Sequence, residues 1–171
     1  MADNNSMQDI ARNVVKNAIN CKVNLSVAES CTGGLISKLI TDIPGSSNCF
    51  SQGLVTYSDD AKTKLLGINT EDLLRFGAVS EFTAKKMAER VAKINNSDFS
   101  LAVTGIAGPT GGTVEKPVGT VWIAWGVKIQ DKFALESELF VFSGDRNEIR
   151  NQSAIMALLG INERIKISKS V

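Results

Sequence analysis

The sequence predicts an α/β fold, a single domain built as a three-layer α/β/α sandwich with a mixed sheet. Apolar runs typical of buried strands alternate with segments of helical periodicity, which indicates helices layered against a sheet. The last two extended runs are joined by a short polar turn, so they are expected to pair as antiparallel strands and make the sheet mixed. The 171 residues suit one domain over 1–171, with 1–5 and 161–171 expected to be frayed.

The first part of the chain is expected to alternate between helix and strand. Apolar residues recur at helical spacing from Met7 to about Asn20, behind a capping residue at Asn5 or Ser6. The segments that follow are, in order, a buried strand, a helix, a loop and a second strand, over residues 22–28, 35–41, 43–47 and 50–57.

Serine and threonine residues mark the starts of the next helices. Ser58 is expected to cap a short helix with Asp59 in its first turn, where a carboxylate favours the positive end of the helix dipole. Thr70 caps another short helix, which ends at Gly77, and Ser80 caps a longer one. The buried face of the longer helix is expected to carry Ala84, Met87, Ala88, Val91 and Ile94.

A third strand over 99–103 leads into a long irregular segment. Residues 105–119 hold five glycines and two prolines, which is too irregular for a helix or strand. A loop of this length in a compact domain is usually functional or disordered. The pairs Gly111-Gly112 and Lys116-Pro117 fit a lid, an anion-binding loop or a disordered loop, and the sequence leaves these open.

The chain is expected to end in a hairpin and a helix. Residues 121–127 and 133–142 form the two strands of the hairpin. Asp145 with Glu148 resembles a capping box that opens the last helix, which runs to about Leu159. A polar tail follows Gly160.

The composition excludes several kinds of chemistry. The chain has no histidine, which rules out Ser-His-Asp and Cys-His catalysis and histidine-ligated metal sites. Cys21, Cys31 and Cys49 are odd in number and irregularly spaced, which indicates reduced thiols in a cytoplasmic protein. The net charge is +1 and no apolar run approaches the roughly 20 residues that span a bilayer. We therefore expect no metal, no cofactor, no nucleic acid and no membrane as partners.

Four clusters of small or polar residues lie at or beside the ends of predicted strands. They are residues 30–34, residues 45–47 with Tyr57, residues 104–112 and residues 143–146. Because ligands of open α/β sheets bind outside the carboxyl ends of parallel strands, several of these clusters are expected to converge on one pocket.

Two of the clusters suit an anion such as phosphate. Ser30, Thr32 and Gly33 lie in a strand-to-helix turn, where small residues allow close approach and the helix N-terminus offers free N–H groups. Arg146 lies near a helix start and suits a bidentate contact to phosphate or carboxylate. The alternatives to anion binding are that the turn is only a structural junction between strand and helix, and that Arg146 is a solvated residue in the first turn of its helix.

Tyr57, Ser58 and Lys62 form the group with the clearest chemistry. Lys62 follows one helical turn after the cap, and a helix N-terminus with partial burial would lower the pKa of its ammonium. A neutral lysine can act as general base toward a serine hydroxyl, and Tyr57 could relay a proton or orient the pair. An ordinary surface lysine beside Asp59 is the alternative. Ser46 and Ser47 lie in a turn before the second strand, which turn chemistry alone would explain.

These motifs together resemble the CinA C-terminal domain family, the nicotinamide-nucleotide amidases. The matching stretches cover about residues 23–150 and make a specific match through their number and order. They are Ala28-Glu29-Ser30-Cys31-Thr32-Gly33-Gly34, Gly45-Ser46-Ser47 through Gly53, Val55-Thr56-Tyr57-Ser58 with Ala61-Lys62, Gly77-Ala78-Val79-Ser80, Thr104-Gly105-Ile106-Ala107-Gly108-Pro109, Gly111-Gly112, Lys116-Pro117-Val118-Gly119-Thr120 and Gly144-Asp145-Arg146.

The resemblance implies hydrolysis of the carboxamide of nicotinamide mononucleotide to nicotinate mononucleotide and ammonia, without a metal. Carried over from the family, the catalytic residues are Ser47, Lys62 and Tyr57. Ser30, Thr104, Gly105 and Arg146 match positions that line the nucleotide pocket. Backbone N–H groups near glycines could serve the oxyanion.

Several alternatives stay open at the level of sequence. Ser30 rivals Ser47 as the nucleophile. The chain could instead be a non-catalytic nucleotide-binding or protein-interaction module linked to competence and DNA damage, or a nucleotide-binding protein that has lost turnover. Ser47, Tyr57 and Lys62 together favour the enzyme, since a binding module would not need all three. A homo-oligomer is also expected.

Overall fold

The computed structural model describes residues 6–168, which form one five-stranded sheet. The strand order is β2-β1-β3-β4-β5. β1 (Leu25–Glu29) pairs in parallel with both β2 (Phe50–Val55) and β3 (Phe99–Gly105). β4 (Thr120–Ile129) and β5 (Lys132–Val141) continue the sheet as antiparallel strands. The predicted mixed sheet is therefore confirmed.

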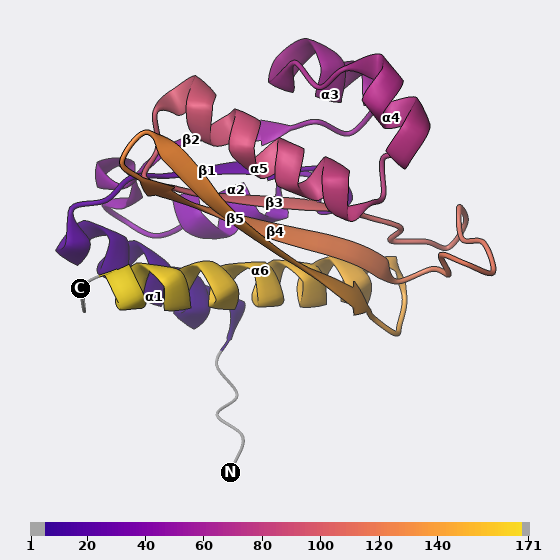
Figure 1. The fold of residues 1–171 in the computed structure, drawn as a ribbon. Helices are drawn as coiled ribbons and strands as arrows, with labels where there is room; N and C mark the ends of the chain where they lie inside the picture. The colour runs from indigo at the N-terminus through magenta and orange to yellow at the C-terminus, as the bar shows by residue number, and fades with distance from the viewer. Residues whose placement is uncertain (1–5, 169–171) are drawn as a thin grey trace.

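Helices cover both faces of the sheet, as expected for a three-layer α/β/α sandwich (Figure 1). One face packs against α1 (Met7–Cys21), α2 (Leu35–Thr41) and α6 (Arg146–Ser168). The other packs against α5 (Glu81–Asn95), with α3 (Asp59–Leu66) and α4 (Thr70–Phe76) beside it. All five residues of β1 are buried, the polar Ser26 and Glu29 included, because helices cover this central strand on both faces. None of the helices within 6–168 is both long and apolar enough to cross a bilayer.

Most of the predicted helix starts are confirmed by capping hydrogen bonds. Ser6, Ser58 and Ser80 each accept a hydrogen bond from a backbone N–H in the first turn of the helix that follows. Asp145 and Glu148 form the predicted capping box, each side chain accepting from the other residue's N–H. The exception is α4, where Asn69 rather than Thr70 is the capping residue.

The last helix is longer than the sequence predicts. It does not end near Leu159 but continues to Ser168, so the expected fraying of 161–168 is wrong; 1–5 and 169–171 lie outside the described residues. Gly160 lies within this helix. The residue there is glycine because a side chain would collide with the Trp125 ring at 2.5 Å. The glycine allows close packing of α6 on β4 and does not end the helix, and Ile161 and Ile165 beyond it are fully buried.

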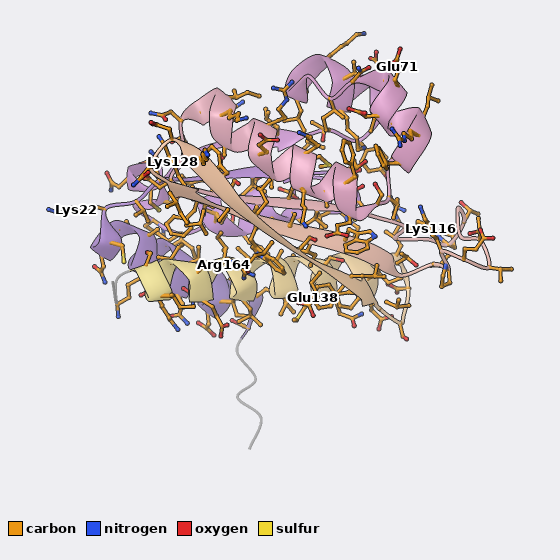
Figure 2. The ribbon with its side chains drawn as sticks, in the orientation of Figure 1. Lys22, Glu71, Lys116, Lys128, Glu138 and Arg164 are labelled. Atoms are coloured by element: carbon orange, nitrogen blue, oxygen red, sulfur yellow. The ribbon has the colours of Figure 1, made fainter. Side chains whose placement is uncertain are left out.

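The parallel strands place the site. β1, β2 and β3 run in the same direction, so their carboxyl ends lie at one edge of the sheet. The turns that follow these ends carry Ser30, Tyr57 and Thr104. Residues 105–119, after β3, project beyond the same edge, with Lys116 on this segment (Figures 1 and 2).

Candidate active site

A cavity of about 270 Å³ lies at the carboxyl edge of the parallel strands. Its lining residues come from five separate segments of the chain, and several of these segments follow strand ends, as the sequence predicts. The lining residues that the sequence singled out are Ser30, Tyr57, Lys62, Thr104, Gly105 and Arg146. Ser47, Thr32 and Gly33, which were also expected in the site, are not among the residues that line this cavity.

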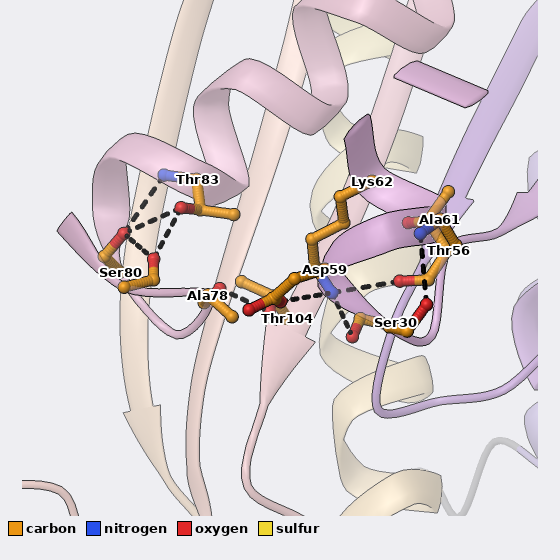
Figure 3. Close-up of polar contacts among 11 residues, drawn as sticks. Ser30, Thr56, Asp59, Ala61, Lys62, Ala78, Ser80, Thr83 and Thr104 are labelled. Atoms are coloured by element: carbon orange, nitrogen blue, oxygen red, sulfur yellow. Dashed lines mark hydrogen bonds and ion pairs between the residues drawn. The ribbon is translucent and has the colours of Figure 1, made fainter. Parts of the chain in front are cut away.

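Lys62 and Ser30 form a hydrogen-bonded pair at the floor of the cavity. Lys62 Nζ lies 3.1 Å from Ser30 Oγ, although 32 residues separate them in sequence. The same Nζ donates to the backbone carbonyl of Thr56 at 3.0 Å, which fixes the end of the lysine side chain (Figure 3). Lys62 is only 1% exposed, so the alternative of a solvated surface lysine is wrong. This is the arrangement of a nucleophile beside its base.

Burial controls the charge of Lys62. Loss of solvation lowers the pKa of its ammonium below the ordinary 10.5, while the Asp59 carboxylate and, to a smaller extent, Cys31 raise it. Asp59 Oδ1 lies 3.9 Å from Nζ, and the Asp59 side chain is 65% exposed, so water weakens its opposing effect. The net shift is downward, which makes the neutral amine, the form that can accept a proton, more accessible.

Cys31 is the other nucleophilic side chain on the cavity wall. Burial raises the pKa of its thiol to about 12, with the Glu29 carboxylate adding to the effect. The thiolate is the reactive form of cysteine, so at neutral pH Cys31 stays a protonated and inert thiol. Ser30 is therefore the better nucleophile of the two neighbours.

Tyr57 and Arg146 lie at the mouth of the cavity and contact each other. Arg146 donates from one guanidinium nitrogen to Tyr57 Oη at 2.5 Å and from another to the carbonyl of Gly108 at 2.7 Å. The Tyr57 side chain is more than half exposed. The hydroxyl of Tyr57 contacts Arg146, whereas Lys62 Nζ contacts Ser30, Thr56 and Asp59.

Ser47, which the resemblance implies to be the nucleophile, does not line this cavity. It is an exposed residue of the short 3₁₀ helix Ser46–Asn48, which precedes β2. The segment before a parallel strand lies at the amino edge of the sheet, and Leu25 at the start of β1 donates to the carbonyl of Cys49 there. Because a strand rises about 3.3 Å per residue, the five residues of β1 place the two edges roughly 16 Å apart. The sequence left Ser30 open as the rival, and the geometry favours Ser30.

The turn after β1 is not an open anion seat, which corrects a second expectation. Its helix, α2, has its N-terminal N–H groups already occupied by a carboxylate of the chain itself. Glu29 accepts from the N–H groups of Gly34, Ile36 and Ser37. The sequence reasoning missed Glu29, although an acidic residue just before a helix is the signal for such a contact.

Thr32 and Gly33 shape the same turn without lining the cavity. The carbonyl of Thr32 accepts from the Arg150 guanidinium at 2.7 Å, which ties the turn to α6. Gly33 has a positive φ of 59°, and a side chain there would meet Arg150. Both residues therefore support the turn from behind, and Ser30 and Cys31 are its members that face the cavity.

Residues 105–108, 110 and 111 line one wall of the cavity, and the segment 105–119 to which they belong is tethered on two sides. Thr104 Oγ1 donates to the carbonyl of Ala78, and Lys116 Nζ donates to the carbonyl of Val79 at 2.8 Å. Arg146 holds Gly108 on the other side. Between 6 and 168 no group of three or more cysteine, aspartate or glutamate residues is arranged to hold a metal ion.

The fold and the site define a class: an α/β sandwich with a buried Ser–Lys pair at the carboxyl edge of its parallel strands. The family model for the CinA C-terminal domain matches residues 7–165, and the chain belongs to that family. A CinA-like protein of Endomicrobium trichonymphae is 49% identical over 91% of this chain. The CinA-like protein of Chlorobaculum tepidum is 46% identical over 90%. The chain spans only about a third of these relatives' own length, 35% and 36%.

Solved structures agree with the family assignment. The competence/damage inducible protein CihA from Agrobacterium tumefaciens superposes with a TM-score of 0.88 at 38% identity, covering 94% of this chain and 95% of that one. The competence damage-inducible protein A (ComA) from Klebsiella pneumoniae gives a TM-score of 0.88 at 31% identity, covering 95% and 98%. The resemblance found in the sequence is thereby confirmed at the level of family and fold.

Proposed function

We propose that this chain is an amidohydrolase that converts nicotinamide mononucleotide to nicotinate mononucleotide and ammonia. The observation that carries the proposal is the contact of 3.1 Å between Lys62 Nζ and Ser30 Oγ on the wall of a cavity. A lysine that is 1% exposed is costly to keep in a fold, and a base poised to lose its proton explains its presence. The family's link to nicotinamide-nucleotide amidases supplies the substrate.

The chemistry follows from the pair. Neutral Lys62 takes the proton of the Ser30 hydroxyl, and Oγ attacks the carbon of the carboxamide. The Lys62 ammonium then gives that proton to the leaving nitrogen, the C–N bond breaks and ammonia departs. Water attacks the resulting Ser30 ester, Lys62 takes the proton of the water, and it returns a proton to Oγ as the ester bond breaks. The Thr56 carbonyl holds Nζ in place through both halves.

The tetrahedral intermediate carries an oxyanion that needs donors. Residues 105–108 line the same cavity as the Ser30–Lys62 pair. The Ile106 N–H already donates to the Thr120 carbonyl at 2.8 Å, so the backbone N–H groups of Ala107 and Gly108 are the candidates for this role. Gly105 brings the main chain close to β4, since a side chain there would lie 2.7 Å from the Thr120 carbonyl. Pairing of Gly105 with Val121 in the β3–β4 ladder fixes the start of this wall, which suits preorganised donors.

The phosphate is assigned to the mouth of the cavity. Arg146 carries more donors than its contacts to Tyr57 and Gly108 use, and its planar fork suits a phosphate. Tyr57 offers an exposed aromatic face beside it, against which the substrate ring can stack. The carboxamide then reaches inward to Ser30. Binding energy from the remote phosphate positions the reacting group, so its loss lowers turnover as well as affinity.

The test is ammonia release from nicotinamide mononucleotide by the purified protein, with free nicotinamide as the second substrate. Lys62→Ala serves as the control, because it removes the base and leaves Ser30 and Arg146 in place. We expect release by the unmodified protein, a strong preference for the nucleotide and loss of activity in Lys62→Ala. Binding of the nucleotide with no release above the control would instead support the non-catalytic binding module.

A further inference from the structure

Glu29 is a fully buried carboxylate directly before Ser30, and the reaction proposed above does not use it. A buried charge is unfavourable unless its hydrogen-bonding capacity is satisfied. Glu29 meets this condition with four donors: Oε2 accepts from Gly34 N at 3.0 Å and Ile36 N at 3.1 Å, and Oε1 accepts from Ser37 N at 2.8 Å and Ser37 Oγ at 2.6 Å. Three of these are backbone groups at the start of α2.

The carboxylate closes the turn that carries Ser30. The chain leaves β1 at Glu29, and the Ser30 N–H donates to Val103 on the neighbouring strand at 2.9 Å. The Ser30 carbonyl then accepts from Gly33 N at 3.0 Å. The turn reaches Gly34, whose N–H returns to the Glu29 side chain. Ser30 is thus held by the sheet before it and by the Glu29 carboxylate after it.

The main chain of Glu29 acts on the other half of the pair. Its carbonyl accepts from Thr56 N at 2.7 Å, at the end of β2. The carbonyl of Thr56 in turn accepts from Lys62 Nζ. One residue is therefore linked to the turn of the serine through its side chain and to the anchor of the lysine through its backbone.

We propose that Glu29 is a positioning residue, whose carboxylate holds Ser30 Oγ within hydrogen-bonding distance of Lys62 and in position to attack the substrate. The inference rests on the proposed function, since it assigns the nucleophile to Ser30. Reaction rates are steeply sensitive to such placement: an error of about 1 Å can lower a rate on the order of 100-fold. Glu29 is not among the residues that line the cavity, so its effect is expected on turnover and not on substrate binding.

Glu29→Gln is the variant that separates charge and acceptor capacity from size. An amide keeps one acceptor oxygen and turns the other into an NH₂ group, which cannot accept from the N–H groups it would face. We expect kcat to fall on the order of 10- to 100-fold, with KM within about 3-fold because Arg146 and Tyr57 are untouched. Glu29→Asp, which keeps the charge on a shorter side chain, is measured in parallel and carries the same test if Glu29→Gln does not fold.

Ser37→Ala is the matched control. It removes the Ser37 Oγ contact to the same carboxylate and leaves the three backbone contacts. Loss of this hydrogen bond is expected to lower the thermal midpoint of the protein. The thermal midpoints of both variants are recorded, so that a loss of stability is separated from a loss of positioning. We expect Ser37→Ala to keep kcat within about 3-fold of the unmodified protein.

The second readout needs no nicotinamide nucleotide. A small alkyl fluorophosphonate labels an activated serine: a bond forms between Oγ and phosphorus, the P–F bond breaks, fluoride leaves and Lys62 takes the hydroxyl proton. Labelling of Ser30 is followed by mass spectrometry on folded protein. We expect the rate of labelling to fall in Glu29→Gln in parallel with kcat and to stay near that of the unmodified protein in Ser37→Ala.

The two readouts separate this inference from the proposed function. If labelling depends on Glu29 but the protein releases no ammonia, the positioning role is supported and the proposal that nicotinamide mononucleotide is the substrate is overturned. Ammonia release with unchanged labelling in Glu29→Gln would overturn the positioning role alone. Losses of kcat in Glu29→Gln and Ser37→Ala that simply follow the drop in each variant's thermal midpoint would also overturn it. Absence of labelling at Ser30 in the unmodified protein would overturn it as well.

Discussion

Replacement of Arg146 by alanine tests whether the mouth of the cavity recognises phosphate. The guanidinium lines the cavity and donates to the Gly108 carbonyl at 2.7 Å and to Tyr57 Oη at 2.5 Å. Neither of these partners is a carboxylate, so its positive charge is available to an anionic substrate. A hydrogen bond to a charged group contributes about 1.5–3 kcal/mol. At about 1.4 kcal/mol for each factor of ten, its removal lowers kcat/KM for the nucleotide by roughly 10- to 150-fold.

The assay compares nicotinamide mononucleotide with nicotinamide riboside, which differs by the phosphate alone. We expect Arg146→Ala to lose most of its activity on the nucleotide and to keep its activity on the riboside within about 3-fold. Arg90→Ala is the matched control, because Arg90 also donates to a backbone carbonyl, that of Gly67, and does not line the cavity. Equal losses on both substrates would refute the reasoning and show that Arg146 acts only by holding the cavity wall.

Two further predictions concern Lys62. Lys62→Met is expected to abolish activity and to raise the free energy of unfolding at neutral pH, because burial holds the folded-state pKa of Lys62 below 10.5. The gain in free energy of unfolding is complete below that folded-state pKa and shrinks as the pH rises toward 10.5. The measurement is urea unfolding of both proteins over this pH range, and a gain that grows with pH would contradict the prediction. Asp59→Asn removes the carboxylate that raises the pKa of Lys62, so the acidic limb of kcat/KM is expected to move to lower pH. Asp60→Asn is the control, because the Asp60 carboxylate pairs with Lys64, and it should leave the acidic limb in place. A shift of the acidic limb to higher pH in Asp59→Asn would count against Lys62 as the base.

The element order was predictable because local signals and packing agree along most of this chain. Helical spacing and serine caps identify α1, α3 and α5, and the apolar runs identify the strands. The error at the end of α6 arose because a glycine near a helix end usually terminates it. Here the close approach of Trp125 to Gly160 requires the absence of a side chain, and the burial of Ile161 and Ile165 extends the helix. Such a contact between distant segments leaves no local signal.

The site was predictable in part. The carboxyl ends of the parallel strands brought Ser30, Tyr57, Lys62 and Thr104 to one cavity, as their positions after strands indicate. Ser47 was not distinguishable from Ser30 on residue type alone, and only the direction of β2 shows that it lies at the opposite edge. The sequence also cannot show that a neighbouring carboxylate already occupies a helix N-terminus. The homo-oligomer and the cytoplasmic location stay predictions.

The most direct test of the central claim, that Ser30 and not Ser47 is the nucleophile, is the rate of ammonia release from nicotinamide mononucleotide by Ser30→Ala and Ser47→Ala. Loss of a catalytic nucleophile lowers kcat by at least about 1,000-fold. Ser30 Oγ lies 3.1 Å from Lys62 Nζ, whereas Ser47 is exposed at the other edge of the sheet. We therefore expect Ser30→Ala to lose release to that extent and Ser47→Ala to keep it within about 2-fold. Full activity in Ser30→Ala, together with loss in Ser47→Ala, would contradict the account.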